Sequence, residues 1–572
     1  MQTSFTNSES GICIKNLMVK DTVKSIKEDE PTRTNSPLFA YSLLSNNIFH
    51  NIFKAKKYQI TILNDINVLL NPSEMCLVFG KPKHSNSILL DHIANPNPNN
   101  NSSGSIQFSN LSSRNQLVMN DGSDNHYPHL SVEQTLQFAL ACSKPHLDNT
   151  ATQQLIDELL QQFEMTHTKT TRVGDNDEFV KGISGGERRR LSLLETLITD
   201  ASIFALDNAT RGLDSSTAFH FIQFLKKLAG QYNKCFMMTL YQGSQSLIDQ
   251  FDKALVIYNG YQIYFGELSG LEPYFAKLGY VKKNDRVTTM EFIDMILDDA
   301  FSRAEKVELL VDSKFVSGSG DDIVSVPFTP EEFHQRWVES EQFEAVRCAI
   351  GQFEKTGIFA VPKNLKSVVA LGPVKQFTTC FWRNTLNNFK NILYYVVQLI
   401  SFILMAIFIG TLFLRLDMTT RGSFARGSVI FFWLILFTFV SISEVKKNFG
   451  NSLIIRRQSK NYHFYHPSIE AITDLLSDFM FKAVEVFIFV VILYFLVNFN
   501  SEAGTFFATY LFVIVFVFTI NQLFHIVARC CSRFSLAAAI SGLLLLWLSV
   551  YGTYVIQYDQ MQKWAKLWTV QI

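Results

Sequence analysis

The sequence predicts a soluble α/β domain followed by an all-α membrane domain. Up to about Lys390, charged, polar and apolar residues are mixed as they are in globular proteins. After that point long apolar blocks carry few charges, and 47% of the 572 residues are hydrophobic, including 51 Phe. A chain of this length exceeds one compact domain. The soluble part therefore precedes the membrane part.

Five apolar blocks are long enough to cross about 30 Å of hydrocarbon at about 20 residues each. The predicted spans lie near residues 392–414, 428–445, 479–499, 506–526 and 534–556 of a membrane domain that covers residues 392–572. Basic residues concentrate in the loops after the second and fourth spans, which places these loops and the soluble part in the cytoplasm. These residues are Lys446, Lys447, Arg456, Arg457, Lys460, Arg529 and Arg533.

Residues 373–391 are predicted to form a helix that lies in the membrane interface, because aromatic and aliphatic side chains gather near one face. Basic side chains on the same helix would then be available to lipid headgroups. An ordinary packed amphipathic helix is the alternative. The residues concerned are Phe377, Phe381, Leu386 and Phe389 on the apolar face, and Lys375, Arg383 and Lys390.

Two charged residues, Lys482 and Glu485, stand three positions apart within the third predicted span. Charges inside a membrane are costly and often functional. Both residues lie near the predicted cytoplasmic end, so we expect a lysine that reaches the interface and pairs with its neighbouring glutamate.

Composition excludes some functions and marks the irregular segments. The 51 basic and 51 acidic residues balance, which argues against a nucleic-acid partner. Eight scattered cysteines indicate neither a zinc site nor a disulfide framework. Residues 1–40 are predicted to be a disordered cytoplasmic tail, and residues 301–372 a linker that contains a flexible segment at Ser317–Ser325. An Asn- and Ser-rich loop is predicted at Asn95–Ser105.

A glycine-containing loop follows a predicted strand in the stretch CLVFGKPKHSNSILL. The preceding text, YQITILNDINVLLNPSEMCLVF, predicts two strands separated by a turn at NPSE. The second strand ends at Gly80, and Ser87 opens a predicted helix. This is the frame of the motif G-x-x-x-x-G-K-[ST], whose amides cradle phosphates and whose hydroxyl holds magnesium. Ser85 replaces the second glycine and Asn86 replaces the lysine.

A second anion site is predicted in VKGISGGERRRLSLLETL. Ser184, Gly185 and Gly186 precede an amphipathic helix, so a hydroxyl and free amides meet the positive end of the helix dipole. Adjacent glycines let the backbone approach a phosphate closely, and Glu187 completes the S-G-G-E motif. Taken alone, this stretch also fits a Gly-rich helix cap followed by a basic solvated face.

The stretch SIFALDNATRGLDSSTA follows about twenty residues later. Its apolar run ends at Asp207, and an aspartate at the end of a buried strand is where nucleotide enzymes hold magnesium. A turn with Gly212, Leu213 and Asp214 comes next. Loop, S-G-G-E segment, strand and turn in this order predict a P-loop nucleotide-binding domain over residues 41–300.

These motifs resemble the nucleotide-binding domain of ABC transporters. The text DNATRGLD, FDKALVIYNGYQIYFGE and TPEEFHQRWVES is similar to the first half of fungal pleiotropic-drug-resistance transporters of the G subfamily, in which the soluble domain comes first. The likeness extends from about Tyr58 to the last residue and includes YHPS at Tyr465–Ser468. Within that family, GSFARGSVIFFWLILFTFVSIS and RRLSLLETLI are most similar to the sterol-uptake branch.

The resemblance also identifies what the site lacks. Active domains of the family use a loop lysine, a glutamate beside the magnesium aspartate, a glutamine that senses the metal and a histidine near the terminal phosphate. The matching positions hold Asn86, Asn208, Gly122 and Tyr241. We expect no intact catalytic residue, because Asn86 carries no positive charge and Asn208 cannot accept a proton from water. Lys81 and Lys83 are in the loop, but at positions that do not copy the lost lysine.

The resemblance implies ATP and Mg²⁺ as ligands, with the chain in a lipid bilayer, expected to be the plasma membrane. It also implies a hydrophobic small molecule as substrate and a second nucleotide-binding and membrane half as partner. Domains of this family bind ATP head to tail between two domains. We expect weak nucleotide binding through Gly80, Ser87 and Asp207, with Ser184, Gly185 and Gly186 donated to the partner's site. The alternatives are a non-hydrolysing regulatory protein and an inactive truncated remnant.

Overall fold

The computed structural model divides into two compact units. The first comprises residues 1–124, 153–166 and 184–368, and the second comprises residues 125–152, 167–183 and 369–572. The residues that the structure describes are 6, 10–24, 57–95, 101–109, 111, 113, 116–175, 180–284, 286–298, 301–312, 326–355, 359–360, 369–417, 419–500, 502–531, 533–551 and 562. Each unit is described by itself below.

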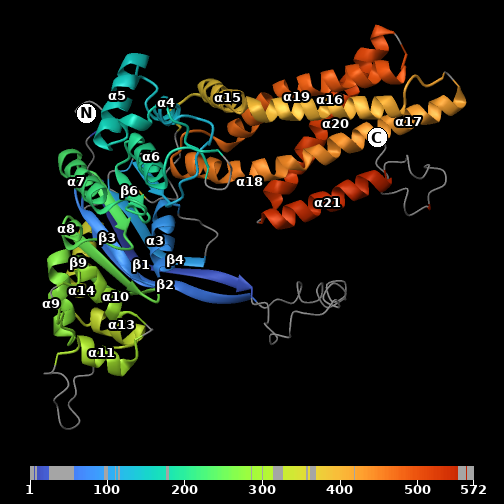
Figure 1. The fold of residues 1–572 in the computed structure, drawn as a ribbon. Coiled ribbons are helices and arrows are strands. Elements are labelled where there is room, and N and C mark those ends of the chain that lie inside the picture. Colours follow the sequence, from blue (N-terminus) through green and yellow to red (C-terminus); the bar gives the residue numbers. More distant parts are fainter. Residues whose placement is uncertain are drawn as a thin grey trace. The chain divides into compact units, whose positions relative to one another are not determined.

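The first unit is built on a ten-stranded sheet with the order β10-β4-β1-β2-β9-β8-β3-β7-β6-β5 (Figure 1). Strand β3 runs parallel to both of its neighbours, β8 and β7. The pairs β7–β6 and β6–β5 are also parallel. Parallel strands bring their carboxyl ends to one edge of the sheet, where ligands bind in α/β folds. The strands are β1 Ile12–Lys24, β2 Lys57–Leu70, β3 Met75–Lys81, β4 Asn101–Ser109, β5 Leu117–Asn120, β6 Ile203–Leu206, β7 Cys235–Thr239, β8 Lys253–Tyr258, β9 Tyr261–Glu267 and β10 Phe359–Ala360.

The helices of the first unit surround this sheet, and one of them, α3, contacts the central strand β3 from which its loop emerges. Helix α5, Asn149–Gln162, contributes residues to both units. The helices assigned wholly to the first unit are α3 Lys83–Ala94, α6 Gly185–Ile198, α7 Ser215–Tyr232, α8 Gln245–Ile248, α9 Leu271–Lys277, α10 Thr289–Ile296, α11 Arg303–Leu310, α13 Pro330–Val338 and α14 Glu341–Lys355.

The two strands predicted before the glycine loop are confirmed as β2 and β3. Every residue of β3 up to Gly80 is buried, as expected for a strand covered on both faces of the sheet. The predicted turn at NPSE lies at the junction of the two strands. The strand, loop and helix order that a phosphate loop needs is therefore present.

The prediction of a disordered tail over residues 1–40 is wrong for Ile12–Lys24, which forms β1 and pairs with β2 and β4. Ile12 and Ile14 are fully buried, although the sequence around them is polar. Their strand pairs with strands that lie far along the sequence. The predicted loop Asn95–Ser105 is likewise wrong from Asn101 onwards, where β4 begins.

The predicted linker over residues 301–372 is also wrong in large part, because α11, α13, α14 and β10 belong to the first unit. Phe333 and Trp337 on α13 are fully buried, and α13 contacts β9 while α14 contacts β2. The segment Ser317–Ser325 lies outside the described residues.

The second unit is almost entirely helical in its described part (Figure 1). Besides α4 and α15 it contains five helical segments that are long and apolar enough to cross a membrane, at 392–412, 422–461, 467–497, 503–530 and 534–551. Each of the five predicted spans overlaps one of these segments, and the third segment begins at Pro467 rather than at residue 479. Residues 552–556 of the fifth predicted span lie outside the described residues. The helices are α4 Val132–Ser143, α15 Pro373–Lys390, α16 Ile392–Leu412, α17 Thr420–Ser441, α18 Ser443–Arg456, α19 Pro467–Val497, α20 Ala503–Cys530 and α21 Phe534–Tyr551.

The core of the second unit forms where α16, α17, α19 and α20 meet. Phe437 and Phe489 are in edge-to-face contact at 5.0 Å, and Trp433 packs edge-to-face against Phe489 in the same cluster. In contrast, α16 exposes large apolar side chains, including Leu393 at 73% and Phe408 at 66%. Apolar exposure on this scale fits a surface covered by lipid.

We predict that Trp337→Ala destabilises the first unit by about 3–5 kcal/mol, the usual effect of removing a fully buried Trp. Trp337 is fully buried and packs against Tyr264, Tyr274 and Phe343 with ring centroids 5.6–5.8 Å away. Urea unfolding in detergent, followed by limited proteolysis of the first unit, measures the change. Val338→Ala on the same helix is the control, because Val338 is 42% exposed. Equal stability of the two variants would contradict the assignment of α13 to the core.

Candidate nucleotide site and buried polar network

The phosphate loop keeps the backbone of such a site. Gly80 has φ +135°, and a Cβ atom there would lie 1.9 Å from the carbonyl oxygen of Ile257, so only glycine fits. Helix α3 begins at Lys83, earlier than the predicted start at Ser87. Its N-cap, Pro82, provides no side-chain hydrogen bond, and the N–H of Ser85 donates to the carbonyl of Pro82 at 3.1 Å. A helix start without a side-chain cap can present its other first-turn amides to an anion.

The side chains of the loop supply less than the backbone. Ser85 and Asn86 are each 3% exposed in the first turn of α3, and Ser87 is half-buried. The Oδ1 atom of Asn86 is buried and has no hydrogen-bond partner in the described structure. A neutral amide cannot contribute the positive charge of the lysine that usually occupies this position.

Asp207 lies at the end of β6, as predicted, and faces the loop. Its Oδ1 atom accepts a hydrogen bond of 2.6 Å from the hydroxyl of Thr239. Asp207 and Asn86 line one cavity of about 10 Å³, which is room for about one water molecule. The full lining is Phe79, Gly80, Lys83, Asn86, Asp207, Thr239, Leu240, Tyr241, Met290 and Asp294.

The predicted nucleotide residues are thus brought together only in part. Gly80, Asn86 and Asp207 share the cavity, whereas Ser85 and Ser87 are absent from its lining. Three features of the site favour phosphate binding, namely the glycine, the helix start without a side-chain cap and a lysine on the lining. The absence of the usual loop lysine opposes it.

Asn208, which is expected at the position of the catalytic glutamate, has a backbone that favours asparagine. Its φ of 50° is left-handed, a conformation that Asn tolerates better than other side chains with a Cβ. Its N–H donates to the Thr239 hydroxyl at 2.7 Å, and its carbonyl accepts from Arg189 at 2.9 Å. The amide side chain cannot act as a general base, so this position does not activate water.

Gly122, which is expected at the position of the metal-sensing glutamine, also has a backbone conformation that favours its own residue type. It has φ +73°, and a Cβ atom there would lie 3.2 Å from the carbonyl oxygen of Asp207. Its N–H donates to Asn120 Oδ1 at 3.2 Å. A glutamine would therefore be strained and crowded here, and glycine offers no side chain to a metal.

Arg189 is singled out by no motif in the sequence, yet its side chain is 1% exposed and lies directly behind the site. Its guanidinium donates to Asn120 Oδ1 at 2.8 Å and to the carbonyls of Asp207 and Asn208 at 2.9 Å. It also lies 3.3 Å from Asp124. Arg189 thereby fixes the end of β6 to α6. Arg188 is buried as well, and the run of three arginines in the sequence carries no signal as to which of them are buried.

Tyr241, which is expected at the position of the histidine near the terminal phosphate, is 40% exposed. The Nζ atom of Lys83 lies 4.2 Å from the centroid of its ring. Burial raises the pKa of the nearby Asp294 carboxyl, and the charges of Lys81 and Lys83 oppose this shift. The cavity lining thus combines one ammonium group with an aromatic ring and two carboxyl groups, those of Asp207 and Asp294.

The S-G-G-E segment forms the predicted helix start. Ser184 is the N-cap of α6, its Oγ accepts from Glu187 N–H at 3.3 Å, and the Glu187 carboxylate accepts from Ser184 N–H at 2.8 Å. A Cβ atom at Gly185 would meet nothing within 4 Å, whereas one at Gly186 would lie 2.7 Å from Gly212 O. Neither Ser184 nor Glu187 lines the cavity beside Asp207. The segment is a surface helix start, separate from this chain's own phosphate loop.

The turn after β6 also forms as predicted. Gly212 has φ +73°, and Asp214 is the N-cap of α7, accepting a 3.1 Å hydrogen bond from the N–H of Thr217. Hydrogen bonds from the Thr217 hydroxyl and amide lower the pKa of Asp214. Leu213 lies between these two residues and is half-buried. The Asp214 carboxylate is therefore used to cap a helix.

In the second unit, Arg383 contradicts its predicted role. Its side chain is 3% exposed and pairs with Glu470, which is 1% exposed, so it is not available to lipid headgroups. The guanidinium also donates to Gln458 Oε1 at 2.9 Å, and Asn384 Nδ2 donates to Glu470 Oε1 at 3.2 Å. The buried face of α15 is polar, and the spacing of apolar residues that predicted an interfacial helix does not reveal this.

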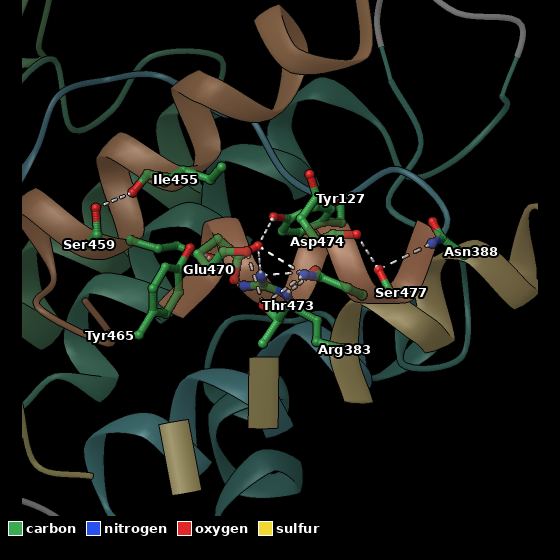
Figure 2. Close-up of polar contacts among 12 residues, drawn as sticks. Tyr127, Arg383, Asn388, Ile455, Ser459, Tyr465, Glu470, Thr473, Asp474 and Ser477 are labelled. Atoms are coloured by element: carbon green, nitrogen blue, oxygen red, sulfur yellow. Dashed lines mark hydrogen bonds and ion pairs between the residues drawn. The ribbon is translucent and has the colours of Figure 1, made fainter. Parts of the chain in front are cut away.

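Aromatic rings complete the surroundings of Arg383. Figure 2 shows Tyr127, Arg383 and Glu470 directed toward one another, and the Tyr127 hydroxyl donates to Glu470 Oε1 at 3.2 Å. The guanidinium carbon lies 4.5 Å from the Tyr127 ring centroid and 4.3 Å from that of Phe138. Burial raises the pKa of Tyr127 well above its ordinary value, so the phenol stays a donor. Segment 125–152 and helices α15 and α19 thus share one buried network.

The charges within the apolar helices also pair differently from the prediction. Lys482 Nζ lies 2.6 Å from Glu444 on α18, so its predicted pairing with Glu485 is wrong. His525 of α20 is 3.7 Å from the other oxygen of Glu444. Glu485 accepts a 3.3 Å hydrogen bond from Gln398 on α16. The charges hold separate helices together, and no local sequence spacing encodes such pairs.

Two family models match the chain in the order of its domains. The model described as ABC transporter matches residues 63–211, and the model described as ABC-2 type transporter matches residues 375–571. The first range contains the phosphate loop, the S-G-G-E segment and Asp207. The fold and the site therefore define an ABC-type nucleotide-binding domain followed by a helical ABC-2 membrane domain.

Curated relatives narrow this class. The chain is 32% identical over 545 residues to Protein SNQ2 of Saccharomyces cerevisiae, covering 90% of this chain and 35% of the relative. It is 31% identical over 536 residues to the ABC multidrug transporter SNQ2 of Candida glabrata, covering 88% and 34%. It is 30% identical over 515 residues to the ATP-dependent permease PDR11 of Saccharomyces cerevisiae, covering 88% and 36%.

The chain belongs to the fungal pleiotropic-drug-resistance type of ABC transporters, subfamily G, and comprises one half of such a transporter. It spans about a third of the length of the curated relatives it matches. It is a multi-pass membrane protein. Identities of 30–32% to these relatives do not single out the sterol-uptake branch.

We predict that Arg383→Met destabilises the second unit by about 3–5 kcal/mol, because it leaves the Glu470 charge buried without its partner. The double variant Arg383→Met with Glu470→Met should recover most of this loss, since no buried charge remains. Thermal unfolding in detergent measures both. Lys375→Met is the control, as Lys375 is exposed on the same helix. A single variant as stable as the control would contradict the pairing.

Proposed function

We propose that the chain is one half of an ATP-dependent transporter, in which its S-G-G-E segment acts on a nucleotide held by a second nucleotide-binding domain. The observation that carries the proposal is the contrast between two helix starts. The start of α6 is complete, with Ser184 capping the helix and Gly185 open, whereas the start of α3 lacks its lysine. The complete S-G-G-E segment cannot be explained by the incomplete phosphate loop of the same chain, so we propose that it serves a nucleotide site on another domain.

Phosphoryl transfer depends mainly on positioning and on stabilising charge around the transferred group. Amides at the start of α6 can supply such stabilisation without a charged side chain. Ser184 is exposed, as is Gly185, and neither lines this chain's own cavity. These features support action in trans, on a phosphate presented by the phosphate loop of the partner half.

The chain's own site supports binding at most, with no hydrolysis. Gly80 and the amides of α3 would hold the phosphates, and Ser87 with Asp207 would hold Mg²⁺, which supplies charge neutralisation when bound. Asp207 already accepts a hydrogen bond from Thr239. Asn208 provides no general base, so ATP bound here would stay intact.

The substrate is proposed to be a hydrophobic small molecule, a sterol or other lipid or a drug, moved across the plasma membrane. The relative from Candida glabrata is named as a multidrug transporter, which supports the drug class. The likeness of the GSFARGSVIFFWLILFTFVSIS segment to the sterol-uptake branch supports the sterol. The required partner is a second nucleotide-binding and membrane half, within one longer polypeptide or as a separate chain.

The chain itself links the site to the membrane helices. Residues 125–152 follow Gly122 and residues 167–183 precede Ser184, and both segments belong to the second unit. Tyr127 and Phe138, which contact Arg383, lie in the first of these segments. A change at Gly122 or Ser184 therefore has a covalent route to the network around Glu470.

A second candidate function is a non-hydrolysing regulatory protein. Asn86 and Asn208 favour it, because the chain's own site then has neither a loop lysine nor a general base. In that role the protein would need no S-G-G-E segment, so variants of this segment separate the two functions.

We predict that Ser184→Arg abolishes ATP-driven transport by the assembled protein, because the large cation removes the cap and occupies the anion site. Uptake or efflux of a labelled sterol and a fluorescent drug, measured in membrane vesicles with ATP, is the readout. Assembly is checked by co-purification of the partner half.

Ser302→Arg is the matched control. Ser302 is an exposed N-cap serine with the same capping box, formed with Glu305 at the start of α11, which is not part of the nucleotide site. Each variant loses one cap, worth about 1 kcal/mol, so a stability effect would appear in both. Transport lost in Ser184→Arg alone supports the proposal. Transport that survives Ser184→Arg would favour the regulatory role.

A further inference from the structure

The two lysines of the phosphate loop have different surroundings. Lys81 Nζ lies 2.7 Å from a carboxylate oxygen of Asp298, so its charge is already paired. Lys83 lines the cavity beside Asp207, and its ammonium group rests on the face of the Tyr241 ring at 4.2 Å. The motif frame treats the two lysines alike, but of the two only Lys83 lines the nucleotide site.

Asn86 provides a second observation at the same place. It is 3% exposed, it lines the same cavity, and its Oδ1 atom has no hydrogen-bond partner in the described part of the chain. A buried acceptor without a partner is unfavourable. An ammonium group with three donors suits this acceptor and still has donors left for an anion.

The charges on the cavity lining also require a cation for an anionic ligand. Asp207 and Asp294 both contribute carboxyl groups to the lining, and Lys83 is the one basic residue among the described residues that form it. The start of α3, which has no side-chain cap, adds only the partial charge of a helix N-terminus. Without Lys83, the phosphates of ATP would meet two carboxyl groups and no compensating ammonium.

We infer that Lys83 is the phosphate-binding cation of this loop and takes over the role of the lysine that Asn86 replaces. On nucleotide binding Lys83 leaves the Tyr241 ring, donates to Asn86 Oδ1 and pairs with the terminal phosphates of ATP. The exchange is favourable because a charge-assisted hydrogen bond to phosphate is stronger than a cation–π contact at a half-exposed site. The inference rests on the proposed function, in which this loop still receives nucleotide.

Photolabelling with 8-azido-ATP tests the inference without any need for hydrolysis. The intact protein is labelled in its native membrane assembly over a range of concentrations, and cross-linked peptides are mapped, so that label near residues 75–94 is distinguished from label on a partner domain. Lys83→Ala should weaken labelling of this segment by about tenfold or more. Lys83→Arg should keep most of it, because the charge is retained.

Lys81→Ala is the matched control. Lys81 belongs to the same loop, but its charge is paired with Asp298 and it does not line the cavity beside Asp207. Labelling of Lys81→Ala should stay within about threefold of the unsubstituted protein. Both alanine variants must elute as assembled protein in size-exclusion chromatography before labelling is compared.

Equal or stronger labelling of Lys83→Ala would overturn the inference, as would an unsubstituted protein with no label on this segment. If transport is still lost in Ser184→Arg, either result leaves the proposed function standing. If labelling depends on Lys83 but transport survives Ser184→Arg, the proposed function fails and the assignment of Lys83 holds.

Discussion

An anion can be held without a charged side chain when unpaired amides at the start of a helix point toward it. Two helix starts of the first unit are candidates for such a site. Helix α3 starts beside Gly80 with no side-chain cap, and α6 starts at Ser184 with Gly185 open to the surface. The architecture around both starts is intact, including the parallel strands that bring Asp207 to the loop after β3.

What differs between the two starts is the chemistry around them. Beside α3, Asn208 has a left-handed backbone and Gly122 lies against the carbonyl of Asp207. The backbone conformation at both positions therefore favours the residues found there over the expected glutamate and glutamine. Arg189 then fixes this arrangement from behind. The second unit shows the same use of buried charge, where Arg383 and Glu470 join helices α15 and α19. Such pairs stabilise only as complete pairs, which makes them sensitive to loss of one member.

The sequence predicts the parts of this molecule that depend on local pattern. The strands β2 and β3, the capped start of α6 and the five apolar helices follow from alternation, capping residues and hydropathy. Prediction fails where partners are distant. The polar start of the chain indicates a tail because the partners of β1, strands β2 and β4, lie far along the sequence. Arg383 looks available to lipid because Glu470 is 87 residues away. The burial of Arg189 depends on carbonyl groups that no side-chain pattern encodes.

The most direct test is to map where the terminal phosphate of ATP lies in the assembled protein. An ATP analogue with a photoreactive group on its γ-phosphate would be cross-linked to the membrane assembly, and the labelled peptides identified by mass spectrometry. Action of the S-G-G-E segment in trans predicts label on Ser184–Glu187, together with label on the phosphate loop of a second nucleotide-binding domain. Label confined to this chain's own loop, in a preparation that hydrolyses ATP, would contradict it.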